Sequence, residues 1–200
     1  MKTDVEPAGS AANTPKTGLN RRRALLLAGA SAAAVAGLDV AAPAPAQAVQ
    51  TGWRWCRQCA SLWRPGLPYT ACPVGGGLGH STVGSGNYLL KAEADGGPGQ
   101  AEWRLCTNCQ AFWWRGNGHT GRCSGATLGH NEVGWGTISP RYLLETASSN
   151  TGGRGQTNWR FCSNCQVLVF NPTGTNSAGR CASGGAHYTG GSWNYRLKFV

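Results

Sequence analysis

The segment Trp53–Cys59 reads WRWCRQC, and its pattern returns twice, as WRLCTNC at 103–109 and WRFCSNC at 159–165. A Gln stands three residues before each Trp, and a third Cys, a His and a Tyr-x-Leu pair follow each segment. The three copies together use all nine cysteines of the chain and three of its four histidines. Self-similarity at a period of about 50 residues predicts one structural unit built three times.

Each copy supplies three thiols and one imidazole, which is the ligand count of a closed tetrahedral metal site. The first two cysteines always have two residues between them, whereas the spacing to the other two ligands varies. A CxxC turn brings two thiolates to one ion, and the loop that follows can vary in length at little entropic cost. The predicted ligands of three structural Zn²⁺ ions are Cys56, Cys59, Cys72 and His80; Cys106, Cys109, Cys123 and His130; and Cys162, Cys165, Cys181 and His187.

Two other interpretations of the cysteines stay open at this stage. Disulfides are usual in exported chains, but three thiols per copy leave one unpaired and give the His no role. Iron or another metal ion is the second alternative. A c-type haem is excluded, because Ala60, Gln110 and Gln166 stand where that motif needs a His.

Residues 1–48 have the features of an export signal. Arg21–Arg23 precede an apolar run from Ala24 to Ala42 that is too weak for a good membrane span, and Ala46–Ala48 forms a small-x-small cleavage site. An Arg pair before a mildly apolar segment resembles a twin-arginine signal, and an ordinary Sec signal is the alternative. The resemblance implies a secreted protein, exported after folding.

The mature chain is expected to be one domain, 49–200, with repeats at 50–90, 100–144 and 156–197. All nine Trp and 27 of the 31 Gly lie after residue 48, where we find no sustained apolar spacing at helical period. Gly-rich chains with short apolar runs favour strands and turns. We therefore predict an all-β fold of three zinc-stapled units, packed with pseudo-threefold symmetry like a β-trefoil. Three separate zinc-ribbon-like beads are the alternative.

Three motifs carry a likeness to a known group of proteins. They are Trp-Arg-x-Cys-x-x-Cys, the Gly-rich stretch before each His, and Gly-Ser-x-Asn-Tyr at 84–88 and 191–195. This pattern resembles the tandem CxxC repeat modules of proteins exported by actinomycetes and other soil bacteria. It also resembles zinc ribbons, except that the third and fourth ligands are not the usual C-x-x-C/H pair. The resemblance implies a secreted, non-catalytic repeat protein.

The charged and aromatic residues limit the kinds of partner that the protein can bind. After residue 48 there are 13 Lys and Arg and five Asp and Glu, and the basic residues are scattered rather than clustered, so we expect no nucleic-acid partner. Aromatic residues that differ between copies on a constant framework predict a contact surface for polysaccharide or cell-wall material. An extracellular protein partner, as for an inhibitor, and simple filling of the core are the alternatives. The candidate binding residues are Trp63, Trp113, Trp114, Trp135 and Trp193.

No catalytic set stands out in the sequence. The five acids do not recur at equivalent positions, and the one histidine outside the metal sets, His119, has no counterpart in the other copies. Glu132 beside His130 is the remaining candidate for a general base at an opened metal site. We predict a protein that is not an enzyme, because no Ser-His-Asp or paired-carboxylate arrangement can be assembled.

Overall fold

The structure is a computed structural model that describes residues 49–67, 70–75, 78–134, 137–149, 154–174 and 178–200. The signal and cleavage site predicted at 1–48 lie outside the described residues and stay predictions. The described part is all-β, with a single 3₁₀ turn, η1 (Glu93–Asp95). No helix in these ranges has the length and apolar character needed to cross a membrane.

Each repeat contributes three strands to the structure. The first repeat forms β1 (Val49–Trp55), β2 (Leu62–Trp63) and β3 (Tyr88–Ala92). The second forms β4 (Gln100–Leu105), β5 (Phe112–Trp114) and β8 (Tyr142–Leu144), with a small extra hairpin of β6 (Val133–Gly134) and β7 (Thr137–Ile138). The third forms β9 (Gly155–Phe161), β10 (Leu168–Phe170) and β11 (Tyr195–Phe199).

The pairing of these strands is the same in every repeat. The first strand pairs antiparallel with the second across the CxxC turn and with the third along the barrel. In each case the Trp of the first strand lies opposite the Tyr of the third. The register shifts at one place in each such pair, where Gly52, Glu102 and Asn158 have φ of 91, 68 and 69°. One local conformation is therefore built three times, which confirms the prediction of three homologous units.

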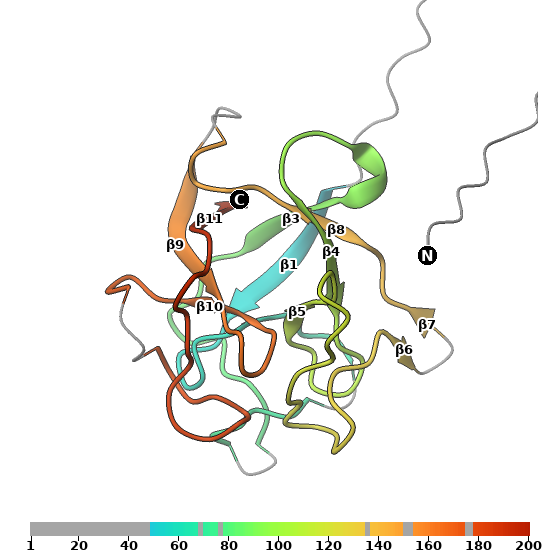
Figure 1. Ribbon diagram of the computed structural model, residues 1–200, viewed down its shortest axis with the longest axis vertical. Helices are drawn as coiled ribbons and strands as arrows, with labels where there is room; N and C mark the ends of the chain where they lie inside the picture. The colour runs from blue at the N-terminus through green and yellow to red at the C-terminus, as the bar shows by residue number, and fades with distance from the viewer. Residues whose placement is uncertain (1–48, 68–69, 76–77, 135–136, 150–153, 175–177) are drawn as a thin grey trace, which may run out of the picture. The chain divides into compact units, whose positions relative to one another are not determined.

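The three units pack together rather than standing as beads. β3 pairs with both β8 and β11, and an isolated bridge joins Thr146 to Tyr195. The second strands meet in the same way, through the bridges Ser61–Val169, Trp63–Ala111 and Trp113–Val167. The result is a nearly closed barrel around a pseudo-threefold axis, with the ligand-bearing loops at the lower side of the view in Figure 1.

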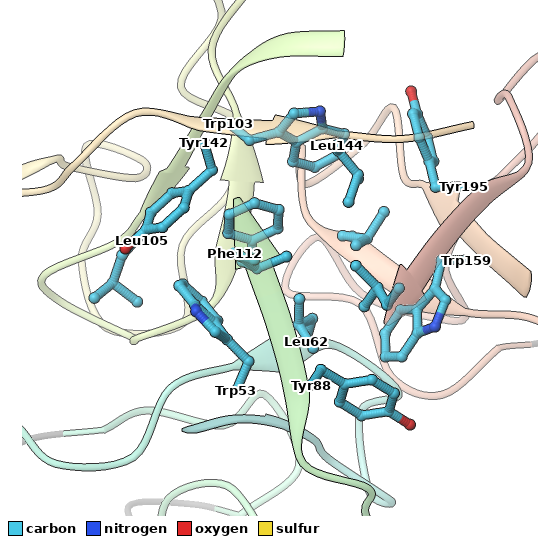
Figure 2. Close-up of a cluster of buried hydrophobic side chains, with 13 residues drawn as sticks. Trp53, Leu62, Tyr88, Trp103, Leu105, Phe112, Tyr142, Leu144, Trp159 and Tyr195 are labelled. Carbon is cyan, nitrogen blue, oxygen red and sulfur yellow. The ribbon is translucent and has the colours of Figure 1, made fainter. Parts of the chain in front are cut away.

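The hydrophobic core is shared by all three units (Figure 2). Its centre is the framework Trp of each repeat, fully buried in every case. Each of these indoles meets the Tyr of another unit edge to face, with ring centroids 5.1 to 5.4 Å apart, and such pairs add about 0.5–1.5 kcal/mol each beyond their buried area. The pairs are Trp53–Tyr142, Trp103–Tyr195 and Trp159–Tyr88.

The tyrosine hydroxyls tie the units together at the polar end of these rings. Tyr88 donates to Gln156 Oε1 and Tyr195 donates to Gln100 Oε1, both at 2.5 Å, and Tyr142 is hydrogen-bonded to Gln50. The recurring Gln before each Trp thus receives a partner from a different repeat. Burial raises the pKa of all three phenols, that of Tyr142 to about 12, so the hydroxyls keep their protons as donors.

Removing one hydroxyl tests this ring of bonds. Tyr195→Phe is expected to lower the free energy of unfolding by about 1 kcal/mol, because Gln100 Oε1 loses a buried donor. Urea unfolding measures the change. Tyr188→Phe is the matched control, since that Tyr is 48% exposed. Equal stability of the two variants would contradict the role assigned to the Tyr–Gln bonds.

Candidate metal centres

The CxxC turns have one backbone conformation in all three units. The N–H of the residue after the second Cys donates to the carbonyl of the first Cys at 2.7 to 2.8 Å, and that residue has φ of 62 to 65°. The N–H of the first Cys donates to the carbonyl oxygen of the residue two positions after the second Cys, at 2.9 to 3.0 Å. Positive φ is unfavourable for residues other than Gly, so its recurrence marks a turn geometry that the site requires. The residues concerned are Ala60, Gln110 and Gln166.

The twelve predicted ligands gather into three groups. Within each group the ligand atoms all lie within 4.8 Å of one another. The first and third Cys sulfurs are 4.0, 3.8 and 4.0 Å apart in the three units, and the second Cys sulfur is 3.3, 3.4 and 3.3 Å from His Nδ1. A tetrahedral Zn²⁺ about 2.3 Å from each sulfur places two sulfurs about 3.8 Å apart. The spacing therefore fits a shared metal ion.

A disulfide does not account for these groups. All nine cysteines lie in the described ranges, and each is a free thiol. A disulfide needs its sulfurs about 2.05 Å apart, far less than the 3.8 to 4.0 Å between the first and third Cys sulfurs. Most of the ligands are buried, with partial exposure only at His80 and Cys123. Three thiols and one imidazole at this spacing instead fit the ligand set of a metal cation.

A hydrogen bond at the second ring nitrogen, Nε2, fixes each histidine in the tautomer that a metal ion needs. Nε2 lies 2.9 to 3.1 Å from the carbonyl oxygen of the second Cys in a neighbouring unit. A carbonyl only accepts, so Nε2 carries the proton and the lone pair of Nδ1 points at the thiols. These bonds run in one direction around the axis. The pairs are His80 with Cys109, His130 with Cys165 and His187 with Cys59.

Without an ion, the protons of each group are shared unevenly. Hydrogen bonds from the neighbouring thiols lower the pKa of one thiol per group, in Cys56, Cys106 and Cys181. Burial lowers the pKa of each His, but hydrogen bonds to two of the cysteines outweigh it and the pKa rises to about 9. A metal ion must displace these protons, so affinity is present at neutral pH and is lost as pH falls.

The candidate binding tryptophans divide into buried and exposed residues. Trp63 and Trp113 are 5% and 1% exposed, and they stack on His80 and His130 at centroid distances of 5.0 and 5.4 Å. Trp114 is partly buried and donates its indole N–H to Ala101 O. These three side chains therefore support the metal groups and the core from inside. Trp193 is 57% exposed, and Trp135 lies outside the described residues.

Several structural residues were missed by the sequence analysis. The Ser of Gly-Ser-x-Asn-Tyr accepts from the backbone N–H two residues after the framework Trp, as Ser85 does from Trp55 and Ser192 from Phe161, both at 2.7 Å. The Trp-Arg motif adds a second tie, because Arg54 and Arg160 donate to carbonyls of the same loops. The recurrence of both motifs was the available signal.

The middle unit uses its Arg differently. Arg104 is 2% exposed and forms ion pairs with Glu102 and Glu132, each at 2.5 Å. Glu132 also contacts Arg115. The carboxylate considered as a general base is thus held between two guanidinium groups, where its charge stabilises a buried Arg.

No protein-family model, curated protein or solved structure matches this chain. The likeness to exported tandem CxxC modules therefore rests on the quoted motifs alone.

The directed His–carbonyl bonds predict that the three groups load metal cooperatively. Loss of one ion frees its His, which then no longer holds the CxxC turn of the next unit. Native mass spectrometry during chelator titration should show mainly the metal-free and three-ion species. Cys106→Ser removes one ligand of the middle group and so interrupts the ring of His–carbonyl bonds. In this variant the remaining two ions should leave at lower chelator concentration. Stepwise loss in the proportions expected of independent sites would contradict this coupling.

Proposed function

We propose that the protein is a secreted, non-catalytic scaffold folded around three structural Zn²⁺ ions. The observation that carries the proposal is the triplicate Cys3His group, with sulfur spacing that fits a tetrahedral ion. Zn²⁺ suits a closed set of three thiolates and one imidazole. Such sites bind with about 10–16 kcal/mol, which compares with a whole domain stability of about 5–15 kcal/mol.

The closed ligand set supports a structural rather than catalytic role. A catalytic Zn²⁺ keeps one position for water or substrate, whereas each group here offers four protein ligands. Stacked indoles cover His80 and His130 from the side. These ions would hold the turns in place and supply no open coordination position.

Secretion through the twin-arginine pathway is the proposed route to the cell exterior. Its support is the Arg-rich stretch before the apolar run and the Ala-Gln-Ala site at 46–48. Export after folding allows thiols to receive metal in the reducing cytoplasm, before disulfides can form.

One preparation tests both the export and the metal proposals. Mass spectrometry of the intact, denatured protein recovered from culture medium should give the mass of a chain that begins at Val49. Elemental analysis of the same protein should give three zinc ions per chain. A strong zinc chelator should abolish the near-ultraviolet circular dichroism of its buried tryptophans, while a calcium-selective chelator should leave it intact. Iron in place of zinc, or a fold that survives complete metal removal, would refute the zinc proposal.

Binding of glycan or cell-wall material is the second proposal, and Trp193 supports it. This exposed indole borders an open hollow of about 600 Å³ whose other lining side chains include Thr146, Ser148 and Asn194. The equivalent positions hold Gly86 and Pro140 in the other units, so the fold itself does not need a Trp there. A flat aromatic face beside hydroxyl and amide groups suits a sugar ring.

Retention on insoluble polysaccharides tests this second proposal. Trp193→Ala should reduce retention at least tenfold, because the stacking face is lost. Tyr188→Ala, which removes another exposed aromatic ring, is the matched control and should bind as the parent protein does. If no polysaccharide retains the parent protein and sugars leave its Trp fluorescence unchanged, an extracellular protein partner becomes the better proposal.

A further inference from the structure

A second hollow lies where the third strands of the units meet. β3, β8 and β11 come together at the upper side of the barrel in Figure 1, away from the ligand-bearing loops. Between them is a hollow of about 270 Å³. Its lining includes Leu90, Leu144 and Leu197, one from each unit and all buried. This apolar lining is the direct product of the threefold Tyr-x-Leu motif.

The residues beside these leucines break the threefold symmetry. The position after the Leu holds Lys91, Glu145 and Lys198 in the three units, and the position before it holds Arg196 in the third unit but Leu in the others. All of these side chains line the hollow. Three cations therefore face one carboxylate above an apolar surface. The repeat alone does not require this charge pattern, because the third strands of the units pair whether the residue after the Leu is basic or acidic.

Two of the cations have no acidic partner in the described part of the chain. Glu145 is used by Lys198, at 3.2 Å. Arg196 donates to the Ala147 carbonyl at 3.0 Å but forms no ion pair among the described residues, and neither does Lys91. Both are partly buried. The hollow thus keeps a net positive charge where solvent is partly excluded, so an anion would be attracted more strongly there than on an open surface.

We propose that this hollow binds a carboxylate that carries a short apolar body. Val49, Leu89 and Pro98, the accessible apolar residues of the lining, would take the apolar part above the buried leucines. Lys91 and Arg196 would receive the carboxylate, Arg196 with a planar donor group that matches it. The source is either a free short-chain acid or the C-terminus of a peptide with small apolar residues. The site is independent of the zinc ions and of the hollow beside Trp193, since it shares neither the metal ligands nor that Trp.

Four probes added to the zinc-loaded protein separate the parts of this proposal. Hexanoate has both the charge and the apolar body, hexanamide has the same shape without the charge, and acetate has the charge alone. Acetyl-dialanine presents a peptide C-terminus. Amide chemical shifts of Leu89, Leu143 and Leu197 should respond to hexanoate, with hexanamide and acetate at least tenfold weaker. Tighter binding of acetyl-dialanine than of hexanoate would identify a peptide end as the source, and the reverse order a free acid.

Substitutions of the basic and acidic residues that line the hollow should change hexanoate affinity in opposite directions. Lys91→Gln and Arg196→Gln should each weaken hexanoate about tenfold and leave hexanamide unchanged, whereas Glu145→Gln should strengthen hexanoate severalfold by releasing Lys198. Arg57→Gln removes an exposed cation at the metal end and should have no effect. Equal binding of hexanoate and hexanamide, a null effect of Glu145→Gln, or absence of any shift at millimolar hexanoate would each overturn the proposal.

Discussion

The hydrogen bond from each imidazole to a neighbouring CxxC turn is the interaction on which the rest depends. It fixes the His tautomer for the ion of its own unit and holds the carbonyl of the second Cys in the next. The chains approach closely at these places. A Cβ at Gly179 would lie 2.4 Å from the Cys59 carbonyl oxygen, and one at Gly121 would lie 2.6 Å from that of Cys165. Glycine is needed there because backbone meets backbone.

A second ring of bonds runs around the axis in the opposite sense. His80 of the first unit reaches the second, whereas Tyr142 of the second reaches back to Gln50 of the first. Each unit is thus held to both neighbours by different side chains, at the metal end and at the barrel end. A single unit would expose its framework Trp and leave its Gln without the Tyr hydroxyl, which explains why the packed arrangement prevails over separate beads.

The triplication made the fold class and the ligand groups predictable, since each ligand recurs at a recognisable place in every copy. The roles of the tryptophans were not predictable in the same way. Trp63 and Trp113 have Val169 as their counterpart, and this variation was interpreted as a sign of surface function. The structure instead stacks both indoles on ligand histidines. The Tyr–Gln hydrogen bonds were also not predicted, because Tyr195 and Gln100 are 95 residues apart and no local period connects them.

The middle unit shows what the repeat actually conserves. Asn87 and Asn194 accept, through Oδ1, from the N–H of the irregular residue in the first strand, at 2.9 and 2.7 Å. The second unit has Arg141 in that place, and Glu93 from the preceding connection accepts from Glu102 N–H at 2.9 Å instead. This partly buried N–H receives an acceptor in every unit, but the identity of the acceptor differs. The positions beside the Leu of each third strand, which line the hollow between β3, β8 and β11, hold different side chains in the three units, so they can acquire a binding role without changing the repeat.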